Sequence, residues 1–126
     1  MKKILIVIAD YYDEVSSELL KSAKYNLSNF SVKIIKVPGV FEIPITISKN
    51  IKKYDAFIAL GCVIKGETPH FDFISSASTN AIMKLSIDNK KPIGNGIITC
   101  LNMKQAKARS KKGKEAAKAV ISVLSQ

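Results

Sequence analysis

The sequence predicts an α/β fold in which a four-stranded parallel sheet is covered by helices on both faces. Four strand-like segments alternate with segments whose apolar residues recur every three or four positions, and the first and third of these strand-like segments are apolar throughout. Continuously apolar runs are typical of strands that are buried on both faces. Strands that alternate with helices favour a parallel sheet, because each helix returns the chain to the edge where the next strand begins.

The first half of the chain contains two strand and helix units. Residues 4–9 form the first apolar run, and the helix after it has an apolar stripe made by Val15, Leu19, Ala23 and Leu27. Residues 32–37 form the second strand, which ends at Pro38-Gly39 because these residues break regular structure. A short helix follows that tolerates Pro44 in its first turn, and one of its faces is made by Ile43, Ile47 and Ile51.

The second half repeats this alternation. Residues 56–64 form the third strand, and a polar turn over residues 65–70 leads into a helix whose expected buried stripe is Phe73, Ile74, Ala77, Ala81, Ile82 and Leu85. Pro92 precedes the fourth strand, residues 93–100, and the last helix has Ala117, Val120, Ile121 and Leu124 in register. We expect residues 1–126 to form one domain, since no linker or repeat divides the series.

Composition excludes several classes of protein. No apolar run approaches the ~20 residues that a membrane-spanning helix needs. Cys62 and Cys100 lie far apart in strand-like runs, without a CxxC pair or a Cys/His spacing that binds metal. We therefore expect reduced thiols in a cytoplasmic protein, with no metal and no cofactor.

The net charge of +10 is unevenly distributed, because residues 104–118 carry seven basic side chains and one acidic one, Glu115. Such a face attracts anions, either phosphate esters or nucleic acid. A lysine-rich helix that is simply solvated explains it equally well. A basic module that binds nucleic acid is therefore kept as an alternative, although the chain lacks a recognisable nucleic-acid motif.

The turn after the third strand carries the most chemistry. Ligands of parallel α/β sheets bind beyond the carboxyl ends of the strands, which directs attention to the four strand-to-helix turns. The third turn contains Thr68 and the only histidine, His70, at the start of a helix. Helix N-termini bind anions through free N–H groups, and an imidazole transfers protons near neutral pH. Alternatively, His70 is only a capping or surface residue.

The other turns offer weaker candidates. Tyr11 and Tyr12 follow the first strand and present rings that can stack on a planar heterocycle, or that merely pack the loop. Phe41 and Glu42 follow the second strand and supply an apolar wall and a carboxylate, although Glu42 also suits the first turn of a helix. Cys100 ends the fourth strand, but the chain has no second histidine to activate it as a nucleophile.

Two segments resemble the signature sequences of the lumazine synthase family. They are Val37-Pro38-Gly39-Val40-Phe41-Glu42-Ile43-Pro44 and Gly66-Glu67-Thr68-Pro69-His70-Phe71-Asp72. The similarity continues through residues 91–93, 96–99, 105–106, Arg109 and residues 112–117, so that it covers nearly the whole chain.

The resemblance implies a flavodoxin-like three-layer αβα sandwich, assembled as homopentamers whose active sites lie between neighbouring subunits. It also implies the penultimate step of riboflavin biosynthesis. In that step 5-amino-6-(D-ribitylamino)uracil condenses with 3,4-dihydroxy-2-butanone 4-phosphate to give 6,7-dimethyl-8-ribityllumazine, phosphate and water. The partners implied are small molecules and further copies of the chain. A relative that binds ribityl ligands without catalysis is the second alternative.

The family's functional residues map onto specific positions. The resemblance implies that His70 transfers protons, that Glu67, Thr68 and Arg109 bind phosphate, with Arg109 acting in a neighbouring subunit, and that Lys112 and Glu115 match further motif positions. It implies that the uracil substrate is bound by Tyr11, Val40, Phe41, Glu42, Val63, Ile64 and Asn95.

Several features depart from the family pattern, among them Asp10, which occupies a position that is often basic or small. Tyr12 replaces an asparagine, and Asn95 replaces a phenylalanine that many members contribute to a neighbour's site. The segment from Arg109 to Lys112 is shorter than in many members. Together with a chain that begins close to its first strand, this short segment favours a free pentamer over a larger shell.

Overall fold

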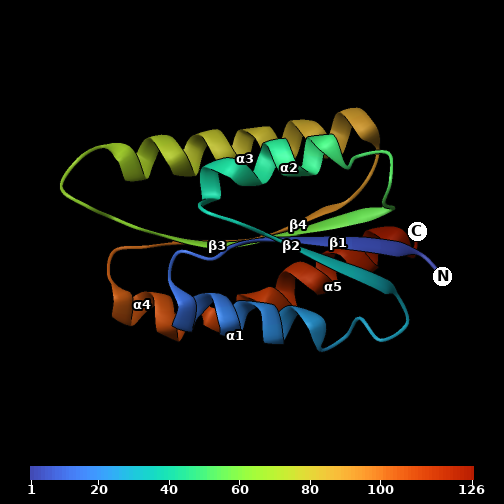
Figure 1. Ribbon diagram of the computed structural model, residues 1–126, viewed down its shortest axis with the longest axis horizontal. Coiled ribbons are helices and arrows are strands. Elements are labelled where there is room, and N and C mark those ends of the chain that lie inside the picture. Colours follow the sequence, from blue (N-terminus) through green and yellow to red (C-terminus); the bar gives the residue numbers. More distant parts are fainter.

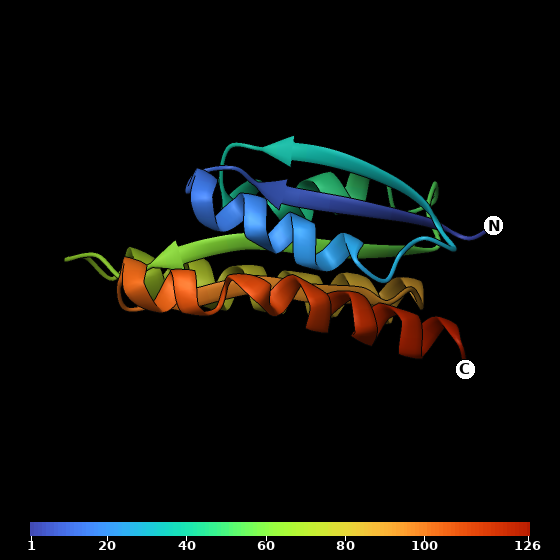
Figure 2. The ribbon, with the colours of Figure 1, turned by 90° about the horizontal axis from the view of Figure 1, so that it is seen from below.

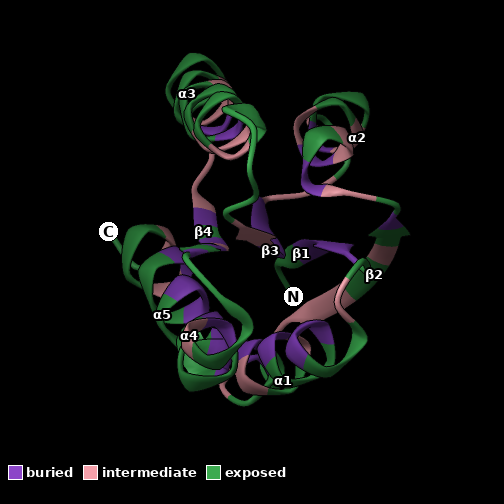
Figure 3. Cartoon of the chain, turned by 90° about the vertical axis from the view of Figure 1, so that its left-hand side faces the viewer, coloured by how far each residue is buried: buried purple, intermediate pink, exposed green.

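Four parallel strands form one sheet between two layers of helices. The computed structural model describes residues 1–126. The strands are β1 (Lys3–Ala9), β2 (Ser31–Val37), β3 (Ala56–Ile64) and β4 (Ile93–Cys100), in the order β2-β1-β3-β4. The helices are α1 (Asp13–Lys24), α2 (Ile43–Lys49), α3 (His70–Asn89), α4 (Met103–Ala108) and α5 (Gly113–Leu124), with 3-10 turns η1 (Val40–Glu42) and η2 (Ser110–Lys112). In Figures 1 and 3, α2 and α3 cover one face, and α1, α4 and α5 cover the other.

The continuously apolar strands are buried because each of their faces meets a helical layer. In β1, every residue from Ile4 to Ala9 is at most 2% exposed. Ile4, Ile6 and Ile8 pack with the helices on the α1 and α5 side, while Leu5 and Val7 pack with α2 and α3. Figure 3 shows the buried residues where both layers face the sheet. The predicted αβα sandwich is confirmed, and its strand order is that of the flavodoxin-like doubly wound fold.

The strand boundaries agree closely with prediction, but the end of the chain differs. A short helix, α4, and the turn η2 precede the predicted last helix, and Figure 2 shows α4 and α5 following one another along the same side of the sheet. Asn102 caps α4, since its Oδ1 accepts a bond from the Gln105 N–H at 2.9 Å. Only Ala106 of α4 is buried, so the sequence has no apolar stripe there to indicate a helix.

Helix α3 buries a narrower face than its predicted stripe. Ser78 and Ile82 are buried, and Ile74, Ala81 and Leu85 are partly buried. The prediction was wrong for Phe73, which is 68% exposed, and for Ala77, which is also exposed. The reason is that α3 contacts the sheet along one line, so its other apolar residues point away from the chain's own core.

No helix in the structure is both long enough and apolar enough to span a membrane.

Candidate active site

An open cavity of about 660 Å³ lies where three strand-to-helix turns meet. Its walls come from the β1–α1 turn, η1, the end of β3 and the start of α3, and its lining residues are Tyr11, Tyr12, Gly39, Val40, Phe41, Glu42, Cys62, Val63, Ile64, His70 and Ile74. In Figure 1 this edge of the sheet is the one away from both chain termini. Strands β1 and β3 are neighbours whose connections diverge, which is where doubly wound sheets bind ligands.

The first wall presents one aromatic ring and fixes another behind it. The rings of Tyr11 and Tyr12 meet edge to face, with centroids 4.8 Å apart and an interplanar angle of 82°. Tyr12 is partly buried against the core, and this burial raises the pKa of its hydroxyl, with smaller contributions from Tyr11 and Cys62. Tyr11 is 73% exposed. The Tyr11 ring is therefore available for stacking, while its contact with Tyr12 fixes its position.

The turn η1 forms the second wall. Val40 is 6% exposed and anchors the turn, whereas the next residue, Phe41, is 67% exposed. The Glu42 N–H donates to the Gly39 carbonyl at 3.2 Å, and the Thr46 hydroxyl donates to the Glu42 carbonyl at 2.8 Å. These bonds hold one apolar ring and one carboxylate at the cavity.

The third wall runs from β3 into α3. Val63 and Ile64 are partly buried at the strand end, and His70 begins α3 with its side chain in the cavity lining. The His70 backbone N–H donates to the Thr68 hydroxyl at 3.4 Å, so that Thr68 closes the start of the helix. Glu67 and Thr68 are exposed and lie beside the lining rather than in it. The free N–H groups of α3 make this a suitable place for an anion.

Seven of the predicted substrate-binding and catalytic residues share this cavity: Tyr11, Val40, Phe41, Glu42, Val63, Ile64 and His70. Sequence reasoning did not include Ile74 and Cys62 in the site. Ile74 was placed in the buried stripe of its helix, yet it lies four residues after His70, hence on the same helix face. That spacing is the signal that would have identified it.

Besides Glu67 and Thr68, four predicted residues do not line the cavity: Asn95, Arg109, Lys112 and Glu115. All four are exposed. The Arg109 Nη1 donates to the Thr99 carbonyl at 3.3 Å, and the Asn95 Oδ1 accepts from the Ile97 N–H at 3.0 Å. Lys112 ends η2, and Glu115 lies in the first turn of α5.

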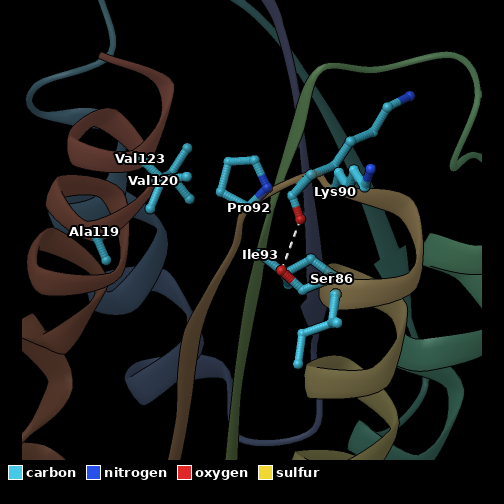
Figure 4. A pocket seen from close by; sticks show the side chains of 9 residues that line it. Ser86, Lys90, Pro92, Ile93, Ala119, Val120 and Val123 are labelled. Carbon is cyan, nitrogen blue, oxygen red and sulfur yellow. Dashed lines mark hydrogen bonds between the residues drawn. The ribbon is translucent and has the colours of Figure 1, made fainter. Parts of the chain in front are cut away.

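A smaller hollow of about 330 Å³ lies near the start of β4, between the C-terminal parts of α3 and α5 (Figure 4). There the Ser86 hydroxyl donates to the Lys91 carbonyl at 2.7 Å, and Lys90 adopts a left-handed conformation at the end of α3. None of the predicted site residues lines this hollow. The Ser86 bond and the conformation of Lys90 terminate α3 beside this hollow. The larger cavity is therefore the candidate site.

The basic segment carries exposed lysines along α4, η2 and α5. Lys107 pairs with Glu14 at 3.0 Å, and the Lys114 ammonium lies 5.3 Å from the centre of the Tyr25 ring. These lysines make contacts at the surface, and none of them lines the cavity. The segment has the features of a solvated face and does not favour nucleic-acid binding as the function.

The two cysteines are free and buried. Cys100 is only 1% exposed, which removes it as a nucleophile for a substrate in the cavity. Burial, with the nearby Cys100, raises the pKa of the Cys62 thiol from 9.0 to about 12. The Cys62 thiol therefore stays neutral at the pH of the cell and contributes an apolar surface to the cavity.

The raised pKa of Cys62 predicts a loss of stability in alkali. Because its folded-state pKa lies above the ordinary value, the unfolded chain releases this proton first, and stability present below about pH 9 is lost toward pH 12. Denaturant unfolding across this range should show a smaller loss of unfolding free energy in Cys62→Ala than in the unmodified protein. Equal losses in the two proteins would contradict the assignment.

The fold and the cavity define an α/β protein with a candidate small-molecule site at the switch point of a parallel sheet. A model of the 6,7-dimethyl-8-ribityllumazine synthase family matches residues 1–126. A 6,7-dimethyl-8-ribityllumazine synthase from Bartonella bacilliformis is 47% identical over 118 residues, which covers 89% of the chain and 78% of that relative. One from Methylorubrum populi is 41% identical over 136 residues (97% and 80%), and one from Agrobacterium fabrum is 41% identical over 135 residues (96% and 91%). The chain belongs to the 6,7-dimethyl-8-ribityllumazine synthase family.

Proposed function

We propose that this protein condenses 5-amino-6-(D-ribitylamino)uracil with 3,4-dihydroxy-2-butanone 4-phosphate to form 6,7-dimethyl-8-ribityllumazine, the penultimate step of riboflavin biosynthesis. The observation that carries the proposal is the cavity in which His70, from the second signature segment, lies with Val40, Phe41 and Glu42 from the first. Membership in the family supports the same reaction. The free thiols of Cys62 and Cys100 are compatible with a reducing compartment, and we place the reaction in the cytoplasm.

The uracil substrate fits the aromatic and apolar part of the cavity. Its planar ring stacks on the exposed Tyr11, with Val63 and Ile64 beside it. The ribityl chain extends along Val40 and Phe41, and its hydroxyl groups donate to the Glu42 carboxylate. Holding the two reactants in contact supplies a large part of the catalysis, because intramolecular arrangements lower barriers by roughly 7–11 kcal/mol.

The reaction requires proton transfer at several steps. The 5-amino group attacks the ketone and forms an imine with loss of water, the phosphate leaves, and the ribityl-bearing nitrogen closes the second ring with loss of another water. His70 lies in the cavity lining and moves protons to and from the reacting amine and oxygen atoms. The departing phosphate lies at the start of α3, beside Glu67 and Thr68, where the helix N–H groups favour an anion.

We place the remaining phosphate ligand on a second copy of the chain. Arg109 is exposed outside its own cavity and is free to reach a neighbour's phosphate, with Lys112 and Glu115 close behind it in sequence. Asn95, on the edge strand β4, faces the neighbour's pyrimidine. The outward apolar residues of α3, Phe73, Met83 and Ile87, are 59–68% exposed and need a partner surface. This exposed face supports association of several copies, and the family resemblance leads us to propose a homopentamer.

Absorbance of the lumazine product tests the reaction directly. Purified protein mixed with both substrates should form lumazine well above the spontaneous background. The same protein with ribitylaminouracil alone is the control for absorbance changes on binding. A folded oligomer that binds the uracil without accelerating the reaction would contradict the enzyme and support a non-catalytic relative.

Light scattering tests the assembly. We expect a particle of five times the 13.8 kDa mass of one chain. A monomer that turns over both substrates would contradict the shared site, and a much larger particle would contradict the free pentamer.

A further inference from the structure

The turn η1 packs against β3 at Gly61, where the strand has no side chain. On the α2 and α3 face of this strand, Ala59 and Val63 carry side chains on either side of Gly61, which has none. A methyl group added at Gly61 would lie 2.8 Å from the Val40 Cγ2 and 3.2 Å from the Ala9 Cβ. The first distance is shorter than carbon atoms tolerate, so Val40 occupies the place that any other residue at 61 would need.

Val40 cannot easily move aside. It is 6% exposed, and as a β-branched residue it has one rotatable side-chain torsion with strong preferences. The Ile43 Cδ1 lies 3.6 Å from the position of the added methyl and closes the other side. Because β3 is held between β1 and β4, we expect relief of the contact to come from movement of the η1 backbone away from the sheet.

Such a movement carries the substrate-binding residues with it. Phe41 and Glu42 follow Val40 directly in η1, and the bonds from Glu42 to Gly39 and from Thr46 to Glu42 tie the turn into a unit. Tyr11 and His70 belong to other turns, and Ala9, which precedes the turn of Tyr11, lies farther from the added methyl than the Val40 Cγ2 does, at 3.2 Å against 2.8 Å. A shift of η1 thus changes the distance from Phe41 and Glu42 to the rest of the cavity.

We propose that Gly61 is a positioning residue for the ribityl-bearing substrate: its bare Cα sets the height at which η1 holds Phe41 and Glu42 above the sheet. This inference rests on the proposed function, because it assigns the η1 wall to that substrate. Gly61 itself does not contact the substrate, and it acts through Val40.

A double-mutant cycle tests the proposal with four proteins: unmodified, Gly61→Ala, Val40→Ala and the double variant. Gly61→Ala should raise KM for ribitylaminouracil by about tenfold, while KM for the butanone phosphate and kcat change by less than about twofold. In the Val40→Ala background, the same glycine substitution should raise KM for ribitylaminouracil much less, because the clash with the Val40 Cγ2 is gone and only the longer contact with the Ala9 Cβ remains.

Gly96→Ala is the matched control for a general loss of stability. A methyl group there would meet the end of the Leu60 side chain, the Ala59 carbonyl oxygen and the Ala116 Cβ, and none of these atoms belongs to η1. This variant should lower the melting temperature without raising KM for ribitylaminouracil. The inference would be overturned if Gly61→Ala raised KM for ribitylaminouracil equally with valine and with alanine at position 40. An increase of this KM in Gly96→Ala would also overturn it.

The two proposals fail in different ways. If the unmodified protein does not turn over its substrates, the proposed function is wrong. If the unmodified protein is active and Gly61→Ala lowers only the melting temperature, the function stands and the positioning role of Gly61 is wrong.

Discussion

Replacing His70 with alanine should lower kcat for lumazine formation by about 10²–10⁴, the usual contribution of a positioned acid and base. The reason is that His70 provides the only imidazole in the chain and that it lies in the cavity lining. The bond that closes the start of α3 uses the backbone N–H of His70 and is retained in the variant. Steady-state absorbance assays, with both substrates saturating, measure the change.

The fold and the assembly provide the control for this prediction. The particle mass and the melting temperature of His70→Ala should stay close to those of the unmodified protein, and residual turnover should exceed the spontaneous rate because positioning is unchanged. His70→Asn keeps hydrogen bonding but not proton transfer near neutral pH, so it should be nearly as slow as the alanine variant. Dissociation of the oligomer by His70→Ala would instead indicate a structural role.

Replacing Arg109 with alanine should raise KM for the butanone phosphate by about 10- to 100-fold, because hydrogen bonds to charged groups are worth about 1.5–3 kcal/mol. KM for ribitylaminouracil should stay within about twofold, since the proposed site of that substrate does not include Arg109. Lys111→Ala is the matched control, because Lys111 is an exposed cation of the same segment to which no phosphate-binding role is assigned. Unchanged kinetics in Arg109→Ala would contradict the phosphate assignment.

Mixed oligomers separate the shared site from a site within one chain. When His70→Ala and Arg109→Ala subunits are refolded together, a site that takes Arg109 from a neighbour regains both residues at about a quarter of the interfaces. Activity should then exceed the sum of the two variants alone. If the mixture shows only that sum, Arg109 acts in its own subunit or not at all.

The strands and the chemistry of the third turn could be predicted from local sequence. A strand covered on both faces must be apolar at every position, so Ile4 to Ile8 identify β1 without knowledge of its neighbours. The end of β3, the polar turn and the start of α3 at His70 were likewise indicated by an abrupt change in composition.

Local patterns failed where burial depends on a partner. Phe73 and Ala77 have helical spacing with the buried residues of α3, yet they face away from the sheet. An apolar periodicity shows that a face is suited to burial, but not which surface covers it. The helix α4 was missed for the converse reason, since one buried alanine leaves no stripe to detect.

By itself, the sequence determined the alternation of strands and helices, the turn that carries His70, and the motifs that resemble the family. Only the tertiary structure decided that Tyr11, Phe41 and Ile64 share one cavity, and that Arg109 does not line it. The physical reason is that the apolar pattern of a segment depends only on its own residues. The order β2-β1-β3-β4, in contrast, arises from packing between distant segments. That order brings the carboxyl ends of β1 and β3 together, and the cavity lies there.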